Sequence, residues 1–181
     1  MIPSPFWFEG KLTPEDYQKL GKLSLRWSHI DHLIANCLKK LLRLTDDEAR
    51  LVVFPLSTDI RLARMRDLQE LNPLPTQAAK QAFDELDRVM KGLQAVRNNV
   101  IHAVLMYADG TDAPIFELRS RSRGYTKAQV FETEELTNYA AHAALVLRHE
   151  LGDKDPAGAP GPLPARPQIP VFLKKLILGH D

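Results

Sequence analysis

The 181-residue sequence contains a single cysteine, Cys37, and almost balanced charges, with 24 basic and 23 acidic residues. One thiol excludes an internal disulfide and lacks the paired thiols of a zinc ribbon or a redox motif, which is typical of a reducing compartment. The net charge of +1 gives no overall attraction to nucleic acid or to membranes. Any anion binding must therefore be local.

Long apolar runs are also absent, and no segment reaches the length that a membrane span needs. The first residues, MIPSPFWF, lack the basic region of a signal peptide and are interrupted by proline. The remaining composition, 44% hydrophobic and 26% charged, is ordinary for a soluble globular protein. We expect a cytoplasmic protein without a membrane contact, with one domain over residues 1–151 and a tail over residues 152–181.

Helical spacing of apolar residues accounts for most of the expected domain. The helix starts are well marked, as where Thr13 precedes Pro14 and where Thr133 precedes two glutamates. The short turns between the first four helices predict antiparallel neighbours in an up-and-down bundle. The predicted helices cover residues 14–42, 46–54, 58–71, 75–104 and 134–151.

After the fourth predicted helix the spacing favours strands. In VLMYADGTDAPIFELRSR, residues 104–121, apolar and aromatic residues flank a turn signal at Asp109-Gly110, which predicts a β-hairpin. The following residues Lys127–Phe131 are compatible with a further strand. The expected fold is therefore mainly all-α, an up-and-down bundle of four to five helices with a small β-hairpin inserted after the fourth helix.

The fourth predicted helix carries a charge inside its apolar stripe. At about 100° per residue its apolar side chains fall on one face, and Arg97 lies in the middle of them. A guanidinium stays charged, so its burial is costly unless an acid or an anionic ligand meets it. The first helix has Asp31 inside its own apolar stripe, and we predict that Asp31 and Arg97 pair. The pair would fix the register of the bundle, and it would also orient Arg97 toward a phosphate.

Two further polar residues accompany Arg97. Asn98 and His102 are four residues apart and lie side by side on the flank of the same helix, so RNNVIH is an Arg-x4-His pattern with asparagine after the arginine. Taken alone, His102 would be a hydrogen-bonded histidine at a helix end. Arg26 and His32 also fit such a pattern, but they lie on opposite flanks of the first helix, about 120° apart, and we interpret that match as chance.

At these residues the sequence resembles the HEPN superfamily (higher eukaryote and prokaryote nucleotide-binding), whose helical-bundle members carry Arg-x4-6-His, often with a polar residue after the arginine. Arg97, Asn98 and His102 match that pattern in order and spacing. The order of elements from Pro14 to Leu151 is similar more loosely. The resemblance does not cover the proline-rich tail.

The resemblance implies a metal-independent endoribonuclease that leaves 2′,3′-cyclic phosphate and 5′-hydroxyl ends, with no cofactor. His102 would transfer protons and Arg97 would stabilise the charged phosphorane, while Asn98 orients the substrate or the imidazole. It also implies a homodimer with two motifs in one cleft, RNA as substrate, a role as a toxin or defence effector, and an antitoxin or regulatory protein as partner. The alternative is a non-catalytic module that binds a nucleotide, RNA or a protein partner.

Other polar residues are weaker candidates. Arg119, Arg121 and Arg123 alternate with serines, so on a strand they point to one side, either to hold RNA phosphates or as a solvated hairpin edge. His29 and His32 lack a third ligand at a convincing spacing, and we expect no metal site.

The tail begins with a linker, residues 153–170, that holds six of the 13 prolines. The segment VFLKKLIL, residues 171–178, follows it. We expect this segment to pack on its own domain, and the alternative is an arm that lies on a second subunit.

Overall fold

The structure is a computed structural model that describes residues 13–102, 104–107, 114–117 and 124–152, together with 161, 162, 165, 168, 169 and 171 of the tail. At the residues of these ranges that fall within 99–128, the structure describes the backbone alone; at the others it also describes the side chains. The described chain is mainly helical, which confirms the expected all-α class at that level. Its helices are α1 (Pro14–Leu41), α2 (Asp46–Val52), α3 (Thr58–Leu71), α4 (Gln77–His102), α5 (Lys127–Phe131) and α6 (Glu134–Glu150).

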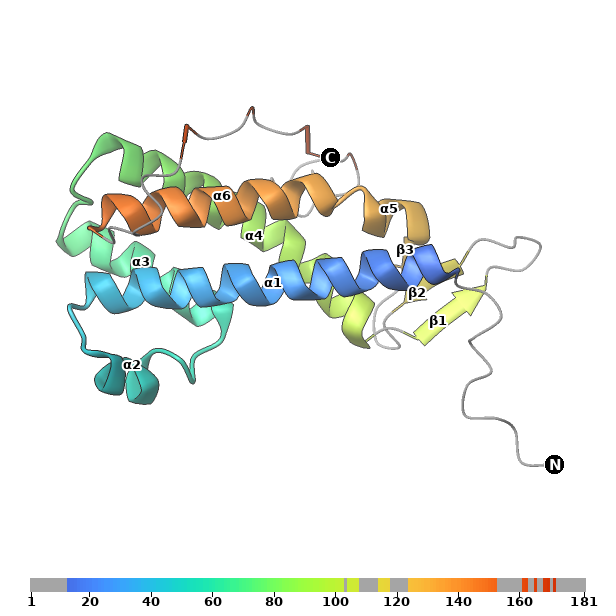
Figure 1. Ribbon diagram of the computed structural model, residues 1–181, viewed down its shortest axis with the longest axis horizontal. Helices are drawn as coiled ribbons and strands as arrows, with labels where there is room; N and C mark the ends of the chain where they lie inside the picture. Colours follow the sequence, from blue (N-terminus) through green and yellow to red (C-terminus); the bar gives the residue numbers. More distant parts are fainter. Residues whose placement is uncertain are drawn as a thin grey trace.

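Three long helices, α1, α4 and α6, form the body of the molecule (Figure 1). The main packing is between α4 and α6 and between α1 and α6, and α3 packs against α1. The helices α1 and α6 run in the same direction and α4 runs opposite to them, while α2 lies outside the body, below the last part of α1 on the side away from α6 (Figure 1). None of the described helices combines the length and the apolar character that a bilayer crossing requires.

The core is built from the apolar stripes that the helical spacing predicts. Ile34 and Leu38 of α1, Leu86 and Leu93 of α4, and Leu147 of α6 are almost completely buried. Burial of each such side chain adds about 1.5–3 kcal/mol to the free energy of unfolding. The one thiol, that of Cys37, is also buried and lies 3.7 Å from the carbonyl oxygen of Ala144, so it is part of the α1–α6 contact.

The helix α1 starts at Pro14 with Thr13 as N-cap, as the sequence predicts, and Thr13 forms a capping box with Asp16. The amide of Thr13 donates to the carboxylate of Asp16 at 2.8 Å, and the amide of Asp16 donates to the hydroxyl of Thr13 at 3.2 Å. Two helix-end amides are thereby satisfied, and Pro14 at the first helical position has no amide hydrogen to satisfy. The start of the helix that carries Trp27 and Asp31 is thus fixed by local hydrogen bonds.

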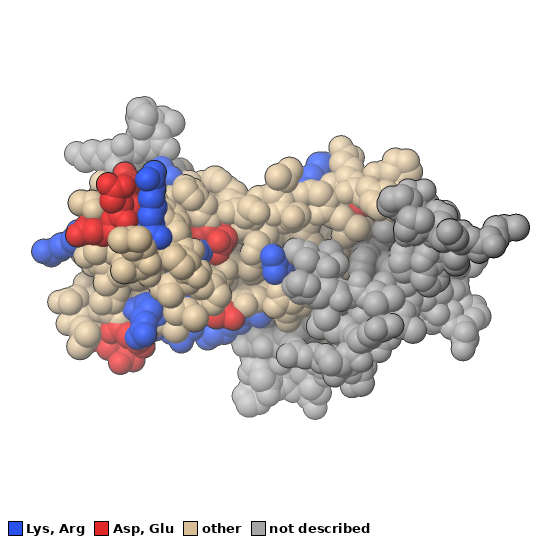
Figure 2. Space-filling model, turned by 90° about the horizontal axis from the view of Figure 1, so that it is seen from below, with Lys and Arg blue, Asp and Glu red and all other residues tan. Residues whose placement is uncertain are grey.

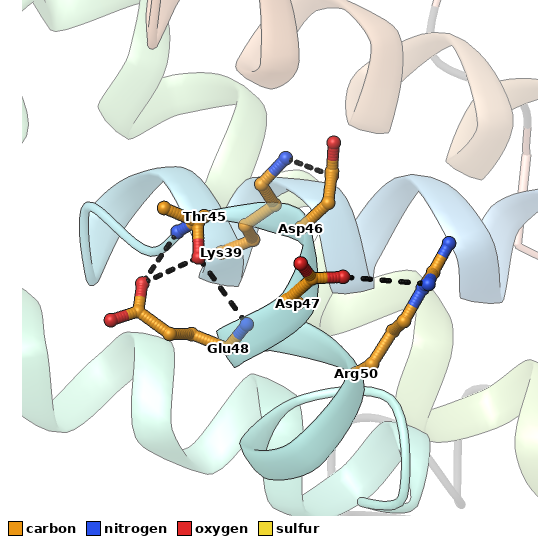
Figure 3. Close-up of polar contacts among 6 residues, drawn as sticks. All are labelled: Lys39, Thr45, Asp46, Asp47, Glu48 and Arg50. Carbon is orange, nitrogen blue, oxygen red and sulfur yellow. Dashed lines mark hydrogen bonds and ion pairs between the residues drawn. The ribbon is translucent and has the colours of Figure 1, made fainter.

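The short helix α2 depends on its caps more than on burial, because Ala49 is its one buried residue. Thr45 and Glu48 form a second capping box, and the carboxylate of Asp46 pairs with the ammonium group of Lys39 at the end of α1 (Figure 3). The hydrogen bonds from Thr45 lower the pKa of Glu48, and the hydrogen bond from Lys39 lowers the pKa of Asp46. These charged contacts hold α2 against the end of α1.

Three short strands follow α4 and form one antiparallel sheet in chain order: β1 (Val104–Tyr107), β2 (Pro114–Glu117) and β3 (Gly124–Thr126). The register pairs Leu105 with Phe116 and Phe116 with Tyr125. The sheet lies at the end of the molecule where α4 ends (Figure 1). The predicted Asp109-Gly110 turn lies outside the described residues.

The suggestion of a strand over Lys127–Phe131 was wrong, because these residues form α5. The reason is local hydrogen bonding combined with burial. Val130 is 1% exposed, and its carbonyl oxygen accepts from both the amide and the hydroxyl of Thr133, so it is not available to a neighbouring strand. This compact turn leads directly into α6.

Candidate functional site

Arg97 lies near the end of α4 and faces α1. Its guanidinium carbon is 5.8 Å from the ring centroid of Trp27, and Trp27 is 8% exposed. At this distance the ring attracts the cation and also shields one side of it from water. The apolar stripe of α4 therefore places the arginine against an aromatic surface, in a half-buried position.

The second contact of Arg97 is with its neighbour in the predicted motif. Its Nη1 donates to Oδ1 of Asn98 at 3.1 Å, and Asn98 is half-buried as well. The Nε of Arg97 is buried and has no hydrogen-bond partner among the described residues. A buried N–H without a partner is unfavourable, so the described residues satisfy this guanidinium incompletely, and because Arg97 as a whole is only half-buried, a ligand anion would have to approach its outer N–H groups.

The predicted partner of Arg97 was Asp31, and the structure gives Asp31 a different one. Oδ1 of Asp31 accepts from Nη1 of Arg61 at 2.7 Å and from the hydroxyl of Thr58 at 2.5 Å. Among the described residues, Arg97 has no ion pair with an acid. The physical reason is that Arg61 belongs to α3, which packs directly on α1, and that its side chain is only 5% exposed.

A signal for Arg61 was present in the sequence. Thr58, Arg61, Leu62 and Met65 are the buried residues of α3 and follow one another at helical spacing. Arg61 is therefore a charge inside an apolar stripe, as Arg97 is, and it also donates to the carbonyl oxygens of Val53 and Phe54 at 3.1 and 2.8 Å. From the sequence we considered Arg97 alone and paired it with the acid that Arg61 binds.

His102 is the last residue of α4, and its side chain is outside the description. Because α4 is helical through this residue, the backbone places Asn98 and His102 one turn apart on the same side of the helix. Arg97 and His102 are five residues apart, which corresponds to about 7.5 Å along the axis. The backbone thus brings the three motif residues to the last two turns of one helix, next to the sheet (Figure 1).

Arg119, Arg121 and Arg123 lie outside the described residues, in the part of the sequence between β2 and β3. On the described face shown in Figure 2, basic and acidic side chains are interspersed at the end that carries α2, and the middle is mainly uncharged. That face therefore has no broad basic surface of the kind that binds nucleic acid without sequence preference.

Arg26 and His32, the second pair that fits the arginine–histidine pattern, both make structural contacts. Arg26 donates from Nη1 to Glu134 of α6 at 2.8 Å, and the ring of His32 stacks on that of Phe54 at 6.2 Å between centroids. The two side chains thus have separate partners on different elements, as expected of a chance match. In the described part of the chain, no group of three His, Cys, Asp or Glu residues is placed to hold a metal ion.

Sequence reasoning did not identify two hollows on the surface. One, of about 640 Å³, lies between α3 and α4, where Asp87 forms ion pairs with Arg66 at 3.2 Å and with Lys91 at 3.0 Å. The other, of about 850 Å³, lies where α5 meets α6 and is partly lined by tail residues. The spacing of Asp87 and Lys91 in the sequence indicates their pair, but no local pattern could have placed the tail.

Comparison with known proteins gives no match to any family model, to any curated protein or to any solved structure. The resemblance of Arg97, Asn98 and His102 to the HEPN pattern therefore stays a prediction from the sequence.

Proposed function

We propose that this chain is a HEPN-like, metal-independent endoribonuclease in which Arg97 and His102 act on the RNA phosphodiester. The observation that supports this proposal is the state of Arg97. Its guanidinium is half-buried against Trp27, bonded to Asn98, and left with an Nε that has no partner in the described part of the chain. Because the residue is only half-buried, a phosphate oxygen can accept from its outer guanidinium N–H groups, and a forked cation suits the charge that develops on a phosphorane.

The proposed reaction is an internal transesterification of RNA. A base removes the proton of the 2′-hydroxyl, the 2′-oxygen forms a bond to the adjacent phosphorus, and the bond from phosphorus to the 5′-oxygen breaks. An acid then protonates the departing 5′-oxygen, so the products are a 2′,3′-cyclic phosphate and a 5′-hydroxyl. Imidazole titrates near neutral pH and can take either role, which suits His102.

One histidine cannot act as base and acid in the same step. A twofold dimer that places two copies of the motif face to face supplies one His102 for each role and two arginines for the phosphorane. The location of the motif in the last two turns of α4 fits this assembly, because residues at a helix end can meet a second copy without disturbing the bundle core.

The wider setting follows from the same proposal. The domain over residues 1–151 would contain the dimer interface and the active site, and residues 152–181 would serve as linker and arm. The protein would act in the cytoplasm as a toxin or defence effector, with an antitoxin or regulatory protein as partner. Arg119, Arg121 and Arg123 would hold RNA phosphates beside the cleft.

The alternative is a binding module that holds a nucleotide, RNA or a protein partner without cleaving it. The contacts of Arg97 favour this alternative as much as the enzyme, because an arginine held by Trp27 and Asn98 can bind a phosphate without any help from His102. The two functions differ in whether His102 is needed for a chemical step.

The deciding experiment incubates the purified protein with end-labelled single-stranded RNA in EDTA. The wild type is compared with His102→Ala, Arg97→Ala and the matched control His32→Ala, which removes the histidine of the chance match. We expect cleavage by the wild type and by His32→Ala, and loss of cleavage in the two motif variants by a factor of about 10² or more. RNA that carries one 2′-deoxynucleotide should resist cleavage at that position.

Mass spectrometry of the fragments distinguishes cyclic phosphate ends from linear ones. Cleavage that continues in His102→Ala contradicts the catalytic role of His102. Cleavage that EDTA abolishes contradicts a metal-independent ribonuclease. RNA binding that Arg97→Ala weakens and His102→Ala leaves unchanged, without any products, supports the binding module.

A further inference from the structure

The hollow where α5 meets α6 has an apolar floor and an acidic rim. Phe131 and Ile169 line its floor and both pack against the buried core. Three glutamates, Glu132, Glu134 and Glu135, stand at its edge. Glu134 is already paired with Arg26, whereas Glu132 and Glu135 are exposed and have no ion pair with any other described residue. The rim therefore has two carboxylates that are available to a cation.

The tail itself reaches this hollow. Gln168, Ile169 and Val171 line it together with α5 and the start of α6, and the described tail residues lie along α6 (Figure 1). Ile169 is half-buried, whereas Val171, the last described residue, is 81% exposed. The chain thus reaches the hollow with a half-buried isoleucine and an exposed valine.

The residues that follow Val171 have the chemistry that the hollow would accept. The sequence continues as Phe172-Leu173-Lys174-Lys175-Leu176-Ile177-Leu178. On a helix, four of its apolar residues share one face and the two lysines lie on either side of it. Since an extended chain spans at most about 3.6 Å per residue, Lys174 lies within about 11 Å of Val171. The two lysines are therefore tethered close to the two glutamates.

We propose that the hollow is the docking site of the chain's own arm, residues 172–178. Its apolar face covers Phe131 and Ile169, and Lys174 and Lys175 pair with Glu132 and Glu135. The short tether favours the arm of the same chain over that of a second copy, because it gives the arm a high effective concentration at the hollow. This docking is independent of the proposed nuclease, since it uses none of the residues assigned to RNA.

Hydrogen exchange of the peptide that contains residues 172–178 tests the docking in the full-length protein. We expect these amides to exchange at least about tenfold more slowly than those of the free peptide. Glu132→Lys with Glu135→Lys should remove this protection, and so should Lys174→Glu with Lys175→Glu, which leaves the helical domain unchanged. The four substitutions together reverse both sets of charges and should restore the protection.

The matched control is Asp67→Lys with Glu70→Lys, which makes the same change of charge on α3 and should leave the arm protected. An arm that exchanges at the rate of the free peptide overturns the proposal. So does protection that the rim substitutions leave intact, or that the α3 control removes equally. Protection that increases with protein concentration assigns the hollow to the arm of a second copy and overturns docking within one chain.

Discussion

Arg61 of α3 donates from Nη1 to the carboxylate of Asp31 of α1 at 2.7 Å, and this ion pair joins two helices that pack directly on each other. The arginine also closes the turn after α2, through hydrogen bonds to the carbonyl oxygens of Val53 and Phe54. One buried cation thus satisfies a carboxylate and two carbonyl groups. These contacts make Arg61 a structural residue and leave Arg97 for another role.

Removal of the carboxylate should therefore destabilise the fold. In Asp31→Ala the guanidinium of Arg61 stays buried without its counter-charge, and we expect the free energy of unfolding to fall by about 2–4 kcal/mol. This loss is smaller than the loss expected for a fully buried ion pair, because the side chain of Asp31 is 33% exposed. Urea unfolding followed by circular dichroism measures this change.

The matched control for this substitution is the exposed pair of Asp47 and Arg50, 3.4 Å apart. Asp47→Ala should change the free energy of unfolding by less than about 1 kcal/mol, because both side chains are solvated. Equal effects of the two substitutions would contradict a structural role for the Asp31–Arg61 pair.

Unlike Asp31→Ala, the substitution Arg97→Met should cause little loss of stability and a large loss of RNA binding. The substitution keeps the apolar stem and removes a buried Nε that no described residue pairs with, so we expect a change in the free energy of unfolding of at most about 1 kcal/mol. RNA affinity should fall by about tenfold or more, because a charge-assisted contact to phosphate is lost.

The fluorescence of Trp27 reports on the same contact. In a Trp7→Phe background Trp27 is the one remaining tryptophan. Addition of RNA should then change the emission of the parent protein and leave that of Arg97→Met unchanged. A strong loss of stability in Arg97→Met, with RNA binding intact, would assign Arg97 to the fold.

The core of α4 should tolerate truncation poorly. Leu93 is 1% exposed and lies one turn before Arg97, so Leu93→Ala removes buried methyl groups and leaves a cavity. We expect a loss of about 2–5 kcal/mol in the free energy of unfolding. The control Leu71→Ala, at a position 76% exposed, should change it by less than about 0.5 kcal/mol, and similar losses at both positions would place Leu93 outside the core.

The helix starts and the apolar stripes were predictable because they depend on local chemistry. Thr13 and Thr45 precede acids at the spacing of a capping box, and the structure shows both boxes. The partner of Asp31 was not predictable in the same way. Spacing shows which charges enter the core, but it does not show which helices are neighbours, so Asp31 was assigned to Arg97 when Arg61 was nearer.

The error at α5 has a similar origin. A stretch of five residues has too little periodicity to distinguish a helix from a strand, and the burial of Val130 together with its bonds to Thr133 decided the outcome. For the candidate site, the sequence placed Arg97 and Asn98 on one helix. It contained no signal for the contact of Arg97 with Trp27, because that contact depends on how α4 packs against α1.

Acid should loosen α2 before it unfolds the bundle. The pKa of Asp46 is lowered below its ordinary value of 3.8 by Lys39, and that of Glu48 below 4.5 by Thr45. A carboxyl group with a lower pKa in the folded state adds stability above its unfolded pKa, and this stability is lost as the pH falls through the folded pKa. We therefore expect α2 to fray below about pH 4, where both groups become protonated.

Hydrogen exchange of residues 45–53, followed as the pH falls from 6 to 3, measures this fraying once the intrinsic pH dependence of exchange is corrected for. In Asp46→Asn with Glu48→Gln the exchange of α2 should already be fast at pH 6 and should change little on acidification, because the carboxylates that lose their charge are gone. The amides of α6, which depend on apolar burial, should stay protected over the same range in both proteins. Protection of α2 in the wild type that persists at pH 3 would show that the packing of Ala49 and Val53 holds this helix without its charged caps.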